Sequence, residues 1–102
     1  MLQSILTNNL DSIQRLCHQH RVKKLYVFGS VCTNYFNESS DVDFLLTFDS
    51  SYFDGYEVNF FSLEEQLQKL LERVVNLLTE DTLKNPYFIK VVNRTKTPIY
   101  EG

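Results

Sequence analysis

Two short apolar segments with a mostly polar stretch between them constrain this chain more than any other feature. They are "KLYVF" (residues 24–28) and "DVDFLLTF" (residues 41–48). Both are too short for a typical helix and are rich in aromatic and aliphatic side chains, so each predicts a strand. The first runs directly into Gly29, which is typical of a tight turn. Residues 31–40 show little periodicity, and we expect a loop there.

The remaining sequence predicts helices that would cover such strands. Apolar residues recur at spacings of three and four over residues 2–20, which predicts one helix with a buried stripe. Ser62 and Glu65 have the spacing of a capping box in front of a leucine stripe, so a second helix is expected to begin at Ser62. A further short helix is expected over residues 86–93, because proline is favoured at the first helical position.

Four other segments carry weaker patterns. "VVNLL" (residues 74–78) predicts a third strand, and "TEDTL" after it a short helical turn capped by Thr79. "TPIYE" (residues 97–101) is expected to be extended. Residues 49–61 carry a glycine and several aromatic side chains, and are compatible with a loop or with the start of a strand or helix. The order of elements predicts an α/β (α+β) domain, a small mixed β-sheet flanked by helices.

Size and charge exclude several classes of protein. A chain of 102 residues predicts a single domain over residues 1–102, with a core small enough for a partner or a second copy to add stability. The net charge of -3 argues against non-specific nucleic-acid binding. No apolar run approaches the roughly 20 residues that cross a bilayer. Cys17 and Cys32 lack metal-ligand spacing, and no export signal precedes them, which favours free thiols in the cytoplasm.

The strongest functional pattern joins the turn to the second strand. Gly29 and Ser30 are followed, after ten residues, by Asp41 and Asp43. Side chains alternate along a strand, so both aspartates are expected on one face, where two carboxylates suit Mg²⁺ with a triphosphate. Gly29 would let the backbone approach phosphate, and Ser30 with the adjacent amides would donate hydrogen bonds to it. The alternative is a turn glycine followed by a strand whose first acids face solvent.

This GS-x10-DxD pattern resembles that of the minimal nucleotidyltransferase (MNT) family, whose fold belongs to the DNA polymerase beta superfamily. The likeness covers roughly residues 20–102 and continues more loosely through "SLEEQLQKLLERVV", "VVNLL" and "PIYE". It implies Mg²⁺-dependent transfer of a nucleotidyl group, with AMP from ATP as the expected case, to an acceptor hydroxyl. Asp41 and Asp43 would be catalytic and hold the metal, and Gly29 and Ser30 would bind the nucleotide.

The resemblance also implies a partner. Many such small domains are encoded beside a small, all-helical HEPN-type protein and act as its antitoxin, either by modifying it with AMP or by binding it. We therefore expect a helical HEPN-type partner and a toxin-antitoxin role.

One position departs from the family pattern in a way that affects chemistry. Asn76 stands in the third strand where active members usually carry a third catalytic aspartate. Asparagine is neutral and cannot act as a base, although Asp41 and Asp43 could still bind the metal that accompanies a triphosphate. Several acids whose position the sequence leaves open are candidates to replace the missing carboxylate, with ordinary solvated acids as the alternative: Asp49, Asp54, Glu57, Glu80 and Asp81.

A second departure lies after the motif serine. Many relatives carry a small residue, an arginine and a glycine there, whereas this chain has "VCTNYF" and lacks that basic phosphate contact. Lys90, Arg94 and Lys96 are candidates to contact phosphate instead, with solvated surface charge as the alternative. Near the first helix's end, His18 and His20 are expected to cap it.

Two rival hypotheses follow. In the first, the chain is a catalytically inactive relative that neutralises its partner by contact alone, which Asn76 favours. In the second, the motif is chance and the chain is a plain structural α/β domain. The aromatic residues 52–61 are compatible with either a core or an interaction surface.

Overall fold

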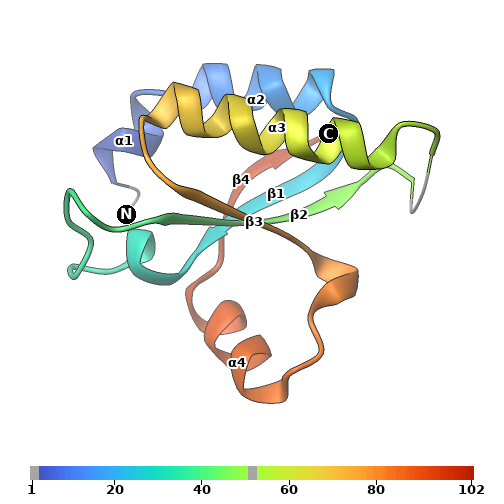
Figure 1. Cartoon of the computed structure of the whole chain (residues 1–102). Helices are drawn as coiled ribbons and strands as arrows, with labels where there is room; N and C mark the ends of the chain where they lie inside the picture. The colour runs from blue at the N-terminus through green and yellow to red at the C-terminus, as the bar shows by residue number, and fades with distance from the viewer. Residues whose placement is uncertain (1–2, 51–52) are drawn as a thin grey trace.

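Four strands form one mixed sheet in the computed structural model, which describes residues 3–50 and 53–102. They are β1 (Val22–Phe28), β2 (Val42–Phe48), β3 (Val75–Thr79) and β4 (Thr97–Glu101). Their order across the sheet is β3-β2-β1-β4 (Figure 1). β2 and β3 run parallel, whereas β1 is antiparallel to both β2 and β4. The predicted fold class is confirmed, and the extended C-terminal segment is an edge strand.

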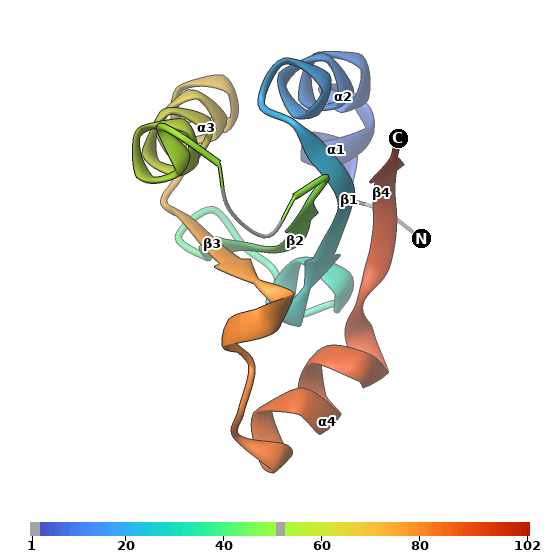
Figure 2. The ribbon, with the colours of Figure 1, turned by 90° about the vertical axis from the view of Figure 1, so that its right-hand side faces the viewer.

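Helices cover both faces of the sheet. α1 (Ser4–Thr7), α2 (Leu10–Gln19) and α3 (Tyr56–Leu71) lie on one face, and α4 (Pro86–Thr95) lies on the other (Figure 2). We call these the closed face and the open face. Among the described residues, no helix is long and apolar enough to cross a membrane.

The larger core fills the closed face. Leu25 of β1 and Phe44 and Leu46 of β2 point into it, and Leu63 and Leu67 of α3 pack over them. Burying side chains of this size stabilises the fold by about 1.5–3 kcal/mol each. Because side chains alternate along a strand, the residues between them on β1 and β2 face α4 instead.

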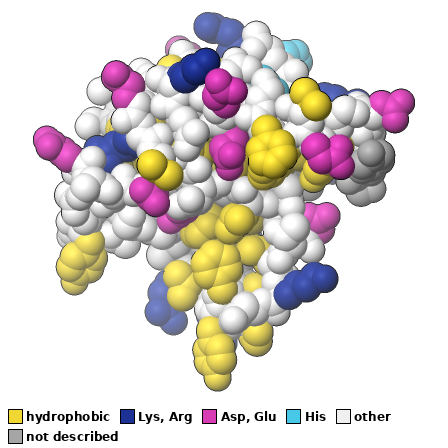
Figure 3. Space-filling view, in the orientation of Figure 1, with side chains coloured by type: hydrophobic (Ala, Val, Ile, Leu, Met, Phe, Trp, Pro, Cys, Tyr) yellow, Lys and Arg dark blue, Asp and Glu magenta, His cyan; other side chains and the backbone are white. Residues whose placement is uncertain are grey.

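A smaller core joins α4 to the open face. It consists of Phe28, Leu45 and Val92. The ring of Phe28 also meets the ring of Phe88 edge to face, with 5.8 Å between centroids. In the space-filling view, hydrophobic side chains gather below the sheet, between it and α4 (Figure 3). This face therefore combines a small apolar contact with polar strand residues.

The single helix predicted over residues 2–20 is wrong, because the structure divides it at Asn9 into α1 and α2. Asn9 Nδ2 donates to the Ile5 carbonyl oxygen at 2.8 Å, which occupies the acceptor that the Asn9 amide would use in a continuous helix. That amide donates instead to the Leu6 carbonyl oxygen. Side chains such as asparagine compete with helical hydrogen bonds in this way. Leu2 lies outside the described residues.

α3 begins at Tyr56, earlier than predicted, so the capping box at Ser62 is wrong. The helix follows Gly55, whose φ of +79° is left-handed, a conformation that glycine adopts readily. Ser62 lies within the helix, and its Oγ is 3.1 Å from His20 Nε2 and accepts from Gln66 Nε2 at 3.0 Å. The hydroxyl thus links α3 to the end of α2.

The aromatic residues of this segment divide between core and surface. Phe53 and Tyr56 pack against the Phe48 ring, with centroid distances of 5.9 and 5.2 Å. Phe61 is 61% exposed on α3. Tyr52 lies outside the described residues. The segment therefore contributes aromatic side chains both to the core and to the surface.

His20 ends α2 as predicted. Its Nδ1 lies 2.7 Å from the Leu16 carbonyl oxygen, to which it donates, and Asn59 Nδ2 donates to the His20 carbonyl oxygen at 2.8 Å. The capping role expected of this histidine is confirmed, and the side chain is buried between α2 and α3.

Short 3-10 turns follow β1 and β3: η1 (Gly29–Cys32) and η2 (Glu80–Thr82). η1 includes the first two residues of the predicted loop. η2 is the helical turn expected after Thr79, but the side chain of Thr79 does not cap it. Instead, the Thr82 hydroxyl donates to the Thr79 carbonyl oxygen at 2.7 Å.

α4 begins at Pro86, as predicted. Asn85 caps it, since its Oδ1 accepts from the amides of Tyr87 and Phe88 at 2.9 and 3.2 Å. The helix continues to Thr95, two residues further than expected.

Candidate functional site

The carboxylates of the sequence motif lie at the beginning of β2. Asp41 immediately precedes the strand. Asp43 lies within it and is on the open face, as is Leu45. β2 and β3 pair in parallel with Asp43 opposite Asn76, so the third position of the family pattern is directly beside the motif. The structure brings all three of these residues together.

The Asn76 amide joins the two carboxylates. Its Nδ2 donates to Asp43 Oδ1 at 2.8 Å and to Asp41 Oδ2 at 3.3 Å. The opposite amide orientation would place Oδ1 against two carboxylates, so hydrogen bonding favours the orientation observed. Both aspartates therefore point to one shared position, which confirms that they lie on the same side of the strand.

The backbone conformation at position 29 and the closeness of Asp43 both favour glycine there. The φ of Gly29 is +77°, and a Cβ added there would lie 2.6 Å from Asp43 Oδ2. Its amide donates to Thr95 Oγ1 at 3.0 Å, so that amide already has a partner within the protein. The next residue, Ser30, has no hydrogen bond from its hydroxyl within the described part of the chain, and it is available to a ligand.

The surroundings of Asp43 disfavour its charged form. Burial raises the pKa of Asp43, the hydrogen bond from Asn76 lowers it, and the negative charge of Asp41 raises it again, with a net upward shift. A group whose pKa is raised is less stable as a carboxylate. A cation at the shared position would reverse this cost.

The donor set suits one hard divalent cation that arrives with phosphate. Mg²⁺ in nucleotide sites takes one or two carboxylates and fills its remaining positions with phosphate oxygens and water. Asp41 and Asp43 supply the carboxylates, and rotation of the Asn76 amide would add a neutral oxygen. Within residues 3–50 and 53–102, no three His, Cys, Asp or Glu side chains form a group able to hold a metal. Two carboxylates that converge on one position fit a cation whose remaining ligands come from a substrate.

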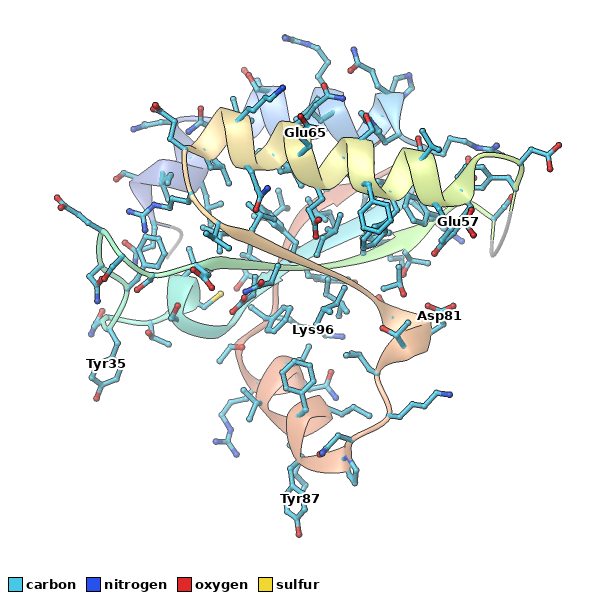
Figure 4. The ribbon with its side chains drawn as sticks, viewed as in Figure 1. Tyr35, Glu57, Glu65, Asp81, Tyr87 and Lys96 are labelled. Atoms are coloured by element: carbon cyan, nitrogen blue, oxygen red, sulfur yellow. The ribbon has the colours of Figure 1, made fainter. Side chains whose placement is uncertain are left out.

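The acids considered as replacements for the third carboxylate lie elsewhere. Asp49 is six positions beyond Asp43 along the chain, about 20 Å at strand spacing, and pairs with Arg21 at 3.4 Å. Glu80 and Asp81 line a surface depression of about 290 Å³ with Asp49, beyond the far ends of β2 and β3. Figure 4 shows Asp81 and Glu57 at that same end. Asp54 precedes α3 there as well. The hypothesis that one of these acids replaces the third carboxylate is therefore wrong for this structure.

Two contacts that position the site were missed by the sequence analysis. Arg73 Nη1 donates to the carbonyl oxygens of Asn37 and Ser40 at 2.7 and 2.9 Å, and its guanidinium lies 4.5 Å from the centroid of the Phe36 ring. It fixes the loop that leads into Asp41. Thr95 does the same for the turn, through the Gly29 amide.

Comparison with known proteins identifies the family. The model of the nucleotidyltransferase domain family matches residues 11–96. The chain belongs to this family. A protein of Methanocaldococcus jannaschii named "Putative protein adenylyltransferase" is 36% identical over 77 residues, which are 76% of each chain. A second protein of that organism with the same description is 34% identical over 83 residues, 78% of each chain.

Solved structures agree on the fold. One described as a "putative minimal nucleotidyltransferase" has a TM-score of 0.76 and 28% identity, and covers 96% of both chains. A toxin-antitoxin structure with AMP-PNP has a TM-score of 0.72 at 17% identity, covering 92% of this chain and 74% of that one. A complex of tri-AMPylated Shewanella oneidensis HEPN toxin with MNT antitoxin gives 0.66 at 15%, covering 94% and 72%. The last two show likeness of fold alone.

Proposed function

We propose that residues 1–102 form a single nucleotidyltransferase domain that binds ATP with Mg²⁺ and transfers AMP to an acceptor hydroxyl. The observation that carries the proposal is the convergence of Asp41 and Asp43 on one position beside the Gly29 turn. Relatives named as protein adenylyltransferases support AMP as the group transferred.

The proposed reaction assigns a role to each motif residue. The acceptor oxygen bonds to the α-phosphorus, the bond from that phosphorus to the bridging β-phosphate oxygen breaks, and pyrophosphate leaves. Mg²⁺, when bound, would neutralise phosphate charge and orient the triphosphate. Asp41 and Asp43 would hold it, and Ser30 would donate to a phosphate oxygen. Asn76 cannot take the proton of the acceptor hydroxyl, so this proton passes to the carboxylate pair or to water.

The proposed acceptor is a hydroxyl of a small helical HEPN-type protein, for which this chain would act as an antitoxin. Support comes from a structural neighbour that is an MNT antitoxin in complex with an AMPylated HEPN toxin. The open face leaves the motif accessible, since Asp41 and Asn76 are both exposed. We place the protein in the cytoplasm, where ATP and reduced thiols such as Cys17 and Cys32 coexist.

One specific observation favours a second function. The Asn76 amide occupies the position shared by the carboxylates and donates one hydrogen bond to each of them without a metal. A protein with this arrangement is a candidate for a binding module that neutralises its partner by contact, with nucleotide transfer slowed or lost.

The experiment that separates the two follows label from α-labelled ATP, with Mg²⁺, into proteins or RNA of the source cell's lysate. Wild type is compared with Asp43→Asn and Asn76→Asp. Labelling by wild type that Asp43→Asn abolishes supports the enzyme and identifies its acceptor. Labelling by Asn76→Asp alone shows that the fold is competent and that the natural chain acts by binding. Absence of label from all three contradicts the transferase assignment.

A further inference from the structure

The nucleotide site proposed above has a deficit of positive charge. A triphosphate and the carboxylates of Asp41 and Asp43 are all negative, and one divalent cation cannot neutralise them. The segment from Gly29 to Ser40 contains no lysine or arginine and adds the negative charge of Glu38. Charge-assisted hydrogen bonds to phosphate therefore have to come from another part of the fold.

Lys96 is located where such a cation is needed. It is the first residue after α4, and it follows Thr95, whose Oγ1 accepts from the Gly29 amide at 3.0 Å. Its φ of -60° and ψ of 134° take the backbone out of the helix and toward β4. Figure 4 shows the Lys96 side chain beneath the sheet, in the space between the strands and α4.

The ammonium lies over a ring on the face that carries the motif. Lys96 Nζ is 5.0 Å from the centroid of the Tyr26 ring. In the pairing of β1 with β2, Tyr26 is opposite Leu45, and Phe28 is opposite Asp43. Tyr26 and Asp43 are therefore diagonal neighbours on the open face, with a spacing of about 7–8 Å. A phosphate chain that begins at the aspartates comes within reach of the flexible lysine.

The charge of Lys96 is not neutralised by a carboxylate. Within the described residues, the ion pairs are Arg21 with Asp49 and Lys69 with Glu65, both remote from this lysine. The contact to Tyr26 is a cation–π interaction, which is attractive but leaves the full positive charge and its N–H donors available. The ring thus keeps the ammonium near the site without consuming its capacity to bind an anion.

We propose that Lys96 is a phosphate-binding residue of this site and supplies the positive charge that the loop after Ser30 lacks. The inference rests on the proposed function, because it requires a triphosphate at Asp41 and Asp43. It adds that the cation comes from the C-terminal end of α4, so that the helix and the nucleotide are physically linked.

The test measures affinity, by calorimetric titration of the full chain with ATP and with AMP in the presence of Mg²⁺. The variants are Lys96→Ala, Lys96→Arg, and the control Lys90→Ala, which removes the same charge from an exposed position within α4. Lys96→Ala is expected to weaken ATP binding about ten-fold or more, and AMP binding by a smaller factor, because fewer phosphates remain to contact. Lys96→Arg is expected to retain most of the affinity, and Lys90→Ala to match wild type. Circular dichroism verifies that each variant is folded.

The outcomes distinguish the two proposals. If wild type binds ATP and Lys96→Ala binds it equally well, the role of Lys96 is wrong while the proposed function stands. If Lys96→Ala and Lys90→Ala weaken ATP binding equally, the effect is one of general surface charge and the specific role is likewise overturned. If wild type binds neither nucleotide, both proposals fail.

Discussion

The two faces of the sheet use the same strands for opposite purposes. On the closed face, Leu25, Phe44 and Leu46 are fully buried beneath α2 and α3. On the open face, the residue before Phe44 is an aspartate whose pKa is raised, and its neighbour on β3 is an exposed asparagine. The comparison teaches that one layer provides most of the stability. The other contains the half-buried carboxylate of Asp43, whose charge is disfavoured first by burial and then by the nearby Asp41, and the proposed function gives this pair a cation to bind.

The largest expected effect tests the closed face alone. Phe44→Ala should lower the free energy of unfolding by about 3–5 kcal/mol, because it removes a buried ring and leaves a cavity. Phe61→Ala, the same substitution at a side chain that is 61% exposed, should cost less than about 1 kcal/mol. Urea denaturation measures both. Similar losses at the two positions would contradict the assignment of Phe44 to the stabilising core of the closed face.

The second prediction concerns the contact between the turn and the aspartate. Gly29→Ala should cost about 2–3 kcal/mol, since it combines a left-handed backbone with a Cβ placed 2.6 Å from Asp43 Oδ2. Gly55→Ala is a matched control, because φ there is +79° but no atom of the described residues lies within 4 Å of the added Cβ. Its cost should be smaller by about 1 kcal/mol or more. If the two substitutions lower the free energy of unfolding equally, the close contact between position 29 and Asp43 does not require glycine.

Asn76→Asp should have an effect that depends on metal. Without divalent cations, a third carboxylate replaces an amide that donates to Asp41 and Asp43, and stability should fall by about 1–3 kcal/mol. Mg²⁺ should restore it, and should raise the melting temperature of this variant more than that of wild type. Thermal denaturation in EDTA and in Mg²⁺ gives the comparison. A variant as stable as wild type in EDTA would mean that the three side chains are not in contact.

The smallest effect has the opposite sign. Asp43→Asn should stabilise the metal-free protein at neutral pH by a few tenths to about 1 kcal/mol, because Asp43 is only partly buried and solvent screens its charge. Its raised pKa means that the folded state disfavours the carboxylate at pH values above that pKa. The difference in unfolding free energy between the variant and wild type should therefore become smaller as the pH falls through the pKa of Asp43. A less stable variant at neutral pH would indicate that the charge is favourable even without a cation.

Features that depend on residues close together in the sequence were predicted correctly. The spacing of Gly29, Ser30, Asp41 and Asp43 places a turn and a strand in order, and strand alternation puts both acids on one side. The apolar patterns of β1, β2 and β3 predicted strands to within about two residues of those observed. Asn76 was also located correctly beside the acids, because the resemblance to the family placed it at the position of the third carboxylate in the third strand.

The predictions that were wrong, and the contacts that were missed, depend on competing local hydrogen bonds or on partners distant in the sequence. The Asn9 side chain interrupts a helix that periodicity alone would continue, and the left-handed Gly55 starts one ahead of a plausible cap. Thr95 and Arg73 reach the site from 66 and 33 or more residues away in sequence, and nothing near them indicates which turn or loop they contact. Such long-range contacts require the fold.

The central claim is that Asp41 and Asp43 form a site for a cation-bound nucleotide, and isothermal titration with ATP tests it most directly. The account predicts that wild type binds ATP in Mg²⁺ and loses most of that affinity in EDTA, whereas Asp43→Asn, although folded, loses the dependence on Mg²⁺. ATP binding that is the same with and without Mg²⁺, or unchanged in Asp43→Asn, would contradict it.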